Sequence, residues 1–144
     1  MTTAISDIEV GFELPGRSWP MSLAHMRLFS GWPGWVKYGR DPVNQHTSEE
    51  VAVKLGRPAP IVQGIQMSAC LEEMFINFFG VEWFYSGRMS VHYVGVTVPG
   101  DTLTTKARVI NKLQEGERTR LEMEIWGENQ RGAKAVVGFA SVLQ

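Results

Sequence analysis

The sequence predicts one α+β domain in which an antiparallel sheet wraps around a single long, buried helix. The stretch from Gln63 to Phe79 is long enough for a helix and carries apolar residues on more than one face. Segments with alternating or continuous apolar residues follow it and are separated by short turns that contain glycine. Such a sheet must cover its apolar face, and this helix is the only predicted element large enough to do so.

Length and composition are those of an ordinary globular protein. The chain has 144 residues, with 44% hydrophobic and 20% charged, and residues 1–144 are expected to form one domain. A formal charge of −1 without a basic block excludes a typical nucleic-acid binder and gives no reason to expect a membrane partner. No signal peptide or bilayer-spanning stretch is recognised. The single cysteine, Cys70, fits a core position in a reduced, cytoplasmic protein, and no Cys/His spacing suggests zinc.

The N-terminal part is predicted to be mostly irregular. Residues 5–21 contain several glycines and prolines and are expected to hold one or two short extended pieces. Ser22 is suited to cap a short helix from Leu23 to Phe29. The glycine- and proline-rich loop that follows contains Trp32 and Trp35. It is interpreted either as a flap anchored on the core or as a lid over a ligand site.

Two more helices are predicted in the first half of the chain. Thr47-Ser48-Glu49-Glu50 has the capping-box pattern, with Thr47 as the N-cap of a helix from Ser48 to Leu55. The long helix then begins near Gln63-Gly64 and ends at Gly80, and most of its surface is expected to be buried.

The rest of the chain is predicted to form strands. The segments are Trp83–Val98, Thr102–Leu113, Arg118–Trp126 and Ala133–Leu143. The last is apolar on both faces, which predicts a position inside the sheet. Because short turns join these segments in order, they are expected to pair as an antiparallel meander.

Two short motifs resemble those of a known enzyme family. Asp41-Pro42-Val43-Asn44-Gln45-His46 resembles the Asp-x-Asn-Pro-x-His signature of the MaoC-like hydratases, with Asp41 and His46 at the same interval. Pro60-Ile61-Val62-Gln63-Gly64-Ile65 is similar to the family's Pro-Ile-Val-His-Gly segment. The resemblance extends from about Ser22 to the end of the chain. It implies the hot-dog fold, in which an antiparallel sheet wraps around a central helix.

The resemblance also implies an activity, the reversible addition of water to a trans-2-enoyl thioester of coenzyme A to give an (R)-3-hydroxyacyl thioester. His46 would be the base toward water, Asp41 its partner and the acid toward Cα, and the Gly64 N–H the group that stabilises the thioester oxygen. No metal or cofactor is implied, because coenzyme A is part of the substrate. A homodimer or a dimer of dimers is expected. The expected substrate-binding residues are Asn44, Gln63, Ile65, Trp32 and Trp35.

Some residues depart from the family pattern or have simpler interpretations. Gln63 stands where the family usually has a histidine, and it cannot titrate. The family's frequent serine falls at Leu71, with Ser68 the nearest hydroxyl. Taken alone, Asp41 before a proline is a common turn starter, and His46 before a helix is more often structural.

Two alternative functions therefore stay open. A hot-dog thioesterase would need a carboxylate on or near the central helix, and Glu72 and Glu73 are the candidates. A non-catalytic hot-dog subunit that binds an acyl thioester is the other alternative, and the glutamine at position 63 keeps it open.

Overall fold

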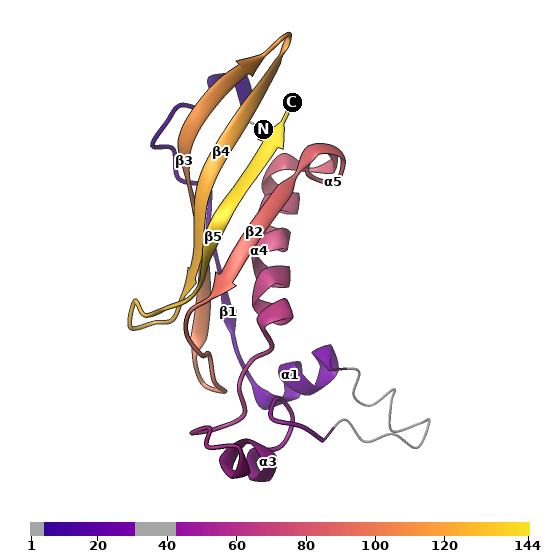
Figure 1. The fold of residues 1–144 in the computed structure, drawn as a ribbon, viewed down its shortest axis with the longest axis vertical. Coiled ribbons are helices and arrows are strands. Elements are labelled where there is room, and N and C mark those ends of the chain that lie inside the picture. The colour runs from indigo at the N-terminus through magenta and orange to yellow at the C-terminus, as the bar shows by residue number, and fades with distance from the viewer. Residues whose placement is uncertain (1–4, 31–42) are drawn as a thin grey trace.

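Figure 1 shows the fold, taken from a computed structural model that describes residues 5–30 and 43–144. No helix in these ranges is long and apolar enough to cross a membrane. In chain order the elements are η1 (Ile5–Asp7), β1 (Arg17–Pro20), α1 (Leu23–Phe29), α3 (Glu49–Lys54), α4 (Gly64–Phe79), α5 (Val81–Ser86), β2 (Arg88–Tyr93), β3 (Thr102–Glu115), β4 (Arg118–Glu128) and β5 (Lys134–Leu143).

The described strands form one antiparallel sheet with the order β1-β3-β4-β5-β2. The meander expected of the last three strands is confirmed, and β5 lies inside the sheet between β4 and β2. The expected pairing of β2 with its successor is wrong, because β2 pairs with β5 and forms the edge opposite β1. Gly138 permits this pairing, since a Cβ atom there would lie 2.0 Å from the carbonyl oxygen of Ser90.

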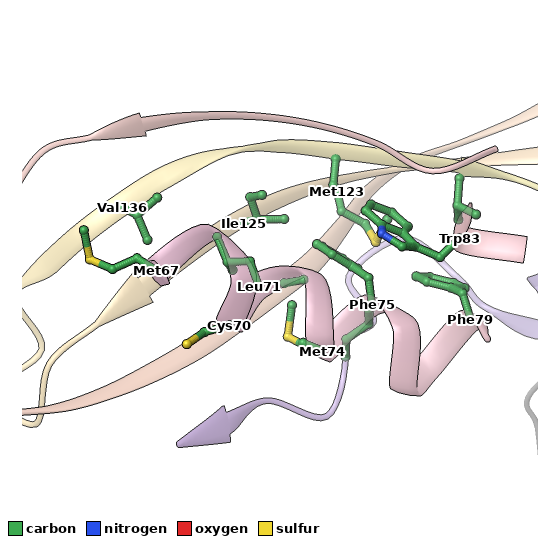
Figure 2. Packing of buried hydrophobic residues seen from close by; sticks show 14 of the residues in the cluster. Met67, Cys70, Leu71, Met74, Phe75, Phe79, Trp83, Met123, Ile125 and Val136 are labelled. Carbon is green, nitrogen blue, oxygen red and sulfur yellow. The ribbon is translucent and has the colours of Figure 1, made fainter. Parts of the chain in front are cut away.

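The long helix α4 begins and ends as predicted, and it packs along the sheet (Figure 1). Gly80 ends it with φ +62°, a conformation that glycine adopts without strain. Figure 2 shows side chains of α4 directed toward Met123 and Ile125 of β4 and Val136 of β5. Most residues of the helix are buried or half-buried, as expected, and only Ile65, Ala69 and Asn77 are exposed, with Ile65 at 64%. The buried face consists of Gln66, Met67, Cys70, Leu71, Met74, Phe75 and Phe79.

The strand expected from Trp83 onward is wrong at its start, because residues 81–86 form helix α5 and β2 begins at Arg88. Trp83 is 5% exposed, and its ring stacks on Phe75 with 4.2 Å between ring centroids. Because the chain turns into helix α5 directly after Gly80, the indole of Trp83 lies in the core beside α4 (Figure 2). This burial outweighs the β propensity of the aromatic residues.

Helices α1 and α3 both lie at the end of the molecule where α4 begins (Figure 1). Helix α1 has the predicted bounds, and the Ser22 hydroxyl accepts a hydrogen bond from the N–H of His25, 3.2 Å away. Helix α3 is capped by Ser48 instead of the expected Thr47. The Thr47 hydroxyl is used elsewhere, because it accepts from the N–H of Asn44 at 3.1 Å.

Candidate functional site

The loop before α3 is organised by Asn44. Its side-chain oxygen accepts a hydrogen bond from the backbone N–H of His46 at 2.8 Å. Its carbonyl oxygen accepts from the N–H groups of Thr47 and Ser48, at 3.1 and 2.9 Å. An asparagine that bonds the backbone two residues ahead forms an Asx turn, which fixes the direction of that backbone. Asn44 therefore sets the position from which the His46 side chain projects.

The half-buried imidazole of His46 is held by one strong contact. Its Nδ1 atom lies 2.7 Å from the carbonyl oxygen of Ile61. A carbonyl oxygen only accepts hydrogen bonds, so Nδ1 carries the proton. In the neutral ring the other nitrogen, Nε2, then has a free lone pair and can accept a proton. This is the tautomer that a general base needs.

The segment that leads to α4 is bonded to the rest of the fold on both sides. The N–H of Ile61 donates to the carbonyl oxygen of Gln45 at 3.1 Å, and the N–H of Val62 donates to that of Thr97 at 2.8 Å. Each residue extends a chain by at most about 3.5 Å, so Gly64 lies within roughly 10 Å of Ile61. The ring of His46 is therefore held near the start of the central helix.

Helix α4 starts with backbone N–H groups that the preceding side chain does not cap. Gln63 is the N-cap residue, but its side chain makes no cap hydrogen bond. Its amide instead donates to the hydroxyl of Ser30 at 2.6 Å, which joins the start of α4 to the end of α1. Backbone N–H groups at a helix start carry partial positive charge and favour a negatively charged oxygen.

Gly64, the first residue of α4, is in close contact with Tyr93 of β2. A Cβ atom at Gly64 would lie 2.7–2.9 Å from three carbons of the Tyr93 ring, closer than such contacts occur. The Tyr93 hydroxyl lies 2.6 Å from the hydroxyl of Ser68, one turn further along α4. Glycine is therefore needed here so that the tyrosine ring can cover the start of the helix.

A pocket of about 310 Å³ lies beside α4, between this helix, β1 and α1. Its volume is at the lower end of the range for small-molecule sites. The α4 residues on its wall follow helical spacing from the first turn onward, so the pocket runs along one flank of the helix. The lining residues are Trp19, Pro20, Met21, His25, Phe29, Gln66, Ala69, Cys70 and Glu73.

The acidic residues and the thiol on α4 already have local roles. The Glu72 carboxylate accepts a hydrogen bond from the indole N–H of Trp83. Glu73 pairs with Arg17 at 2.9 Å on the surface. Burial, with a smaller contribution from the Glu73 charge, raises the pKa of the Cys70 thiol to about 11. Cys70 is therefore a neutral thiol near pH 7 and a poor nucleophile.

The residues expected to form the site fall into three groups. Asn44 and His46 lie in a loop that contacts Ile61 in the segment leading to Gln63 and Gly64, whereas Ile65 is 64% exposed. The remaining expected residues, Asp41, Trp32 and Trp35, lie outside the described residues. Across residues 5–30 and 43–144 there is no group of three His, Cys, Asp or Glu that could hold a metal ion.

Three residues near the site were not anticipated from the sequence. Tyr93 lies in β2, far from Gly64 in the sequence, so no local sequence pattern predicts their contact. Gln66 and Trp19 line the pocket beside α4. Gln66 has a signal in the sequence, because it is the only polar residue on the otherwise apolar face of the helix.

A larger hollow, of about 470 Å³, lies over β2, β4 and β5 and includes outward-facing residues such as Arg88, Glu122 and Phe139. Neither His46 nor Gly64, the candidate catalytic residues within the described ranges, lines it. It is therefore separate from the site at the start of α4.

Comparison with known proteins finds likeness at the level of structure. No family model and no curated protein matches the chain. The MaoC-like dehydratase from Rhodospirillum rubrum superposes with a TM-score of 0.76 at 19% identity, covering 96% of this chain and 94% of that one. The unliganded R-hydratase PhaJ1 from Pseudomonas aeruginosa gives 0.74 at 20% identity, covering 95% and 82%. An (R)-hydratase from A. caviae involved in PHA biosynthesis gives 0.69 at 20% identity, covering 94% and 96%.

These structures cover nearly the whole chain, so the likeness concerns the complete arrangement of sheet and central helix. The fold class expected from the sequence is confirmed. The chain has the hot-dog fold, and its structural neighbours are the MaoC-like dehydratases and the (R)-hydratases.

Proposed function

We propose that this protein catalyses the reversible hydration of a trans-2-enoyl thioester to an (R)-3-hydroxyacyl thioester. The observation that carries the proposal is the contact between His46 and Ile61, which leaves Nε2 of His46 as a proton acceptor next to the start of α4. The hydratase neighbours have the same fold, which supports the reaction class. The motif from Asp41 to His46 supplies the second acid–base group.

In this mechanism one water molecule adds across the double bond. Nε2 of His46 takes a proton from the water while its oxygen bonds to Cβ. The electrons of the double bond move toward the thioester oxygen, which the N–H of Gly64 stabilises at the helix start. The electrons then return to Cα, which takes up a proton from Asp41, and His46 passes the water proton to Asp41, so both side chains regain their starting forms. The net change is the addition of one H and one OH.

The pocket beside α4 is the proposed site of the acyl chain. It starts at Gln66, in the first turn of α4, and has apolar walls that include Met21, Phe29 and Ala69. A thioester oxygen at the N–H of Gly64 would then leave the chain free to follow the flank of the helix.

The test is incubation of the purified protein with crotonyl-CoA. Loss of the enoyl absorbance without release of thiol is the expected result. Release of free thiol would instead favour a thioesterase, for which Glu73 is the carboxylate on the pocket wall. If the enoyl absorbance stays constant and no thiol is released, the result favours a non-catalytic subunit that binds an acyl thioester.

We also propose that the protein is a homodimer joined through the edge of the sheet at β2. Among the described strands, β2 pairs only with β5. Apolar side chains are exposed at and just beyond this edge, with Tyr93 at 51%, Val94 at 57% and Val96 at 48%. An unpaired edge with exposed apolar residues favours pairing with another chain. A second copy would cover both.

A further inference from the structure

Two buried polar groups on the wall of the pocket beside α4 have no hydrogen-bond partner. The side-chain oxygen of Gln66 and the indole N–H of Trp19 are both shielded from solvent, and neither has a partner within the described part of the chain. Gln66 is only 8% exposed as a residue. Buried polar groups are almost always hydrogen-bonded, and an unpaired one is costly. Both residues line the same pocket.

The surroundings hold these groups in place instead of satisfying them. The guanidinium of Arg17 lies over the Trp19 ring, 5.1 Å from its centroid, and also binds Glu73. Gln66 belongs to the first turns of α4, on the face that packs into the fold. Among the other lining residues, Phe29 and Cys70 offer no strong acceptor or donor, and neither His25 nor Glu73 bonds to the two unpaired atoms. Both residues line the pocket, so rotation of the two side chains toward it would let a ligand there pair with both groups.

The chemistry of the two groups selects the ligand. The indole of Trp19 only donates, so its partner must contain an acceptor, which excludes an ammonium group. The amide of Gln66 presents an oxygen at one end and an NH₂ group at the other. A hydroxyl both donates and accepts, so it can serve the indole and either end of the amide.

We propose that this pocket selects acyl groups that carry a hydroxyl beyond the reacting carbons, recognised by Gln66 and Trp19. The inference rests on the proposed function, in which the acyl chain lies along α4. Gln66 precedes Ala69 and Cys70 on the pocket wall, so the hydroxyl would lie near the start of the part of the chain that enters the pocket. An alkyl chain of equal length would leave both polar groups unpaired.

The experiment compares trans-2-hexenoyl-CoA with its 4-, 5- and 6-hydroxy analogues. We expect at least one analogue to have a kcat/KM about 10-fold higher than the unsubstituted substrate, because a site built for a hydroxyl rejects the chain that lacks it. Gln66→Met keeps the length of the side chain and removes the amide, and Trp19→Phe removes the indole N–H. In each variant the ratio of kcat/KM for the hydroxy analogue to kcat/KM for the unsubstituted substrate should fall to near 1. Met74→Leu, a buried change on α4 away from the pocket, should keep it.

Calorimetric titration with hexanoyl-CoA and its hydroxy analogues separates this inference from the proposed function. Tighter binding of a hydroxy analogue without any hydration would overturn the reaction but support the hydroxyl pocket. Hydration with equal kcat/KM for all four enoyl substrates would overturn the hydroxyl pocket and leave the reaction intact. A preference that survives both Gln66→Met and Trp19→Phe would also overturn it.

Discussion

Nδ1 of His46 lies 2.7 Å from the carbonyl oxygen of Ile61, which joins the loop before α3 to the segment that starts α4. The contact has a chemical consequence and a geometric one. It places the proton on Nδ1 and leaves Nε2 as the acceptor. It also couples the position of the proposed base to that of the Gly64 N–H, because Ile61 and Gly64 belong to one short segment.

The first prediction concerns Asn44, which fixes His46 through its side-chain oxygen. Asn44→Ala removes this acceptor and should lower kcat for enoyl-CoA hydration by about 10- to 100-fold with little change in KM, because it misplaces the base. Asn44→Asp keeps an oxygen in place and should restore most of kcat. A raised KM with unchanged kcat in Asn44→Ala would make Asn44 a substrate-binding residue instead.

The second prediction isolates the Gly64 N–H. Any side chain at position 64 meets the Tyr93 ring, so the comparison is made in a Tyr93→Ala background. Gly64→Pro and Gly64→Ala then both add a Cβ atom, but only proline removes the N–H. The kcat of the proline variant should be about 100-fold lower than that of the alanine variant, which is the typical loss for one oxyanion donor.

The backbone before Gly64 tolerates proline, because Gln63 already has φ −62° and ψ 138°, an extended conformation allowed before proline. Circular dichroism should confirm that both variants fold. Equal kcat in the two variants would remove the Gly64 N–H from the mechanism.

The third prediction concerns Asp101, in the turn before β3. Its buried carboxylate accepts hydrogen bonds from the Val98 N–H, Gln130 and Arg131 at 3.1, 2.9 and 3.2 Å. Burial alone would raise the pKa of Asp101, but the bonds from Gln130 and Val98 and the charge of Arg131 lower it below its ordinary value near 3.8.

The Asp101 carboxylate therefore stabilises the fold above its unfolded-state pKa, and this stability is lost as the pH falls through the lower pKa of the folded state. Asp101→Asn should reduce the free energy of unfolding at pH 7 by about 1 kcal/mol. In urea titrations the difference from the parent should shrink as the pH drops below about 4. A difference independent of pH would mean that the charge contributes nothing.

The fourth prediction concerns the dimer. Val94→Glu places a charge beside the β2 edge and should shift the protein toward monomer in light scattering at micromolar concentration. Val53→Glu on α3 is the matched control, because Val53 and Val94 are both 57% exposed. A parent protein that is already monomeric, or equal effects of the two variants, would contradict an interface at β2.

The fold was largely predictable because its strongest local signals agree with its tertiary structure. Helix α4 is apolar and flanked by proline and glycine, and β3 and β4 alternate apolar and polar residues. Helix α5 was missed because valine and aromatic residues favour strands, whereas the contacts that bury Trp83, with Phe75, Phe79 and Glu72, favour a helix here. The place of β2 was missed because strand pairing across the sheet is not encoded in one segment.

The candidate site was predictable in part for a similar reason. The sequence indicated His46 and Gly64 through short motifs, and the structure holds them in neighbouring segments. The tautomer of His46 depends on the carbonyl of Ile61, and the need for glycine at position 64 depends on Tyr93. These are contacts between distant residues, so no spacing rule reveals them.

The central claim is that Asp41 and His46 act on one water molecule. Its most direct test is the rate of enoyl-CoA hydration by Asp41→Asn, His46→Gln and the double variant, each checked for folding by circular dichroism. Each single change should lower kcat by at least about 100-fold, the typical loss of a general acid or base. The double variant should be little slower than the singles, because residues that act as a unit are not additive. Hydration at the parent rate by both folded single variants would contradict the claim and favour the non-catalytic subunit.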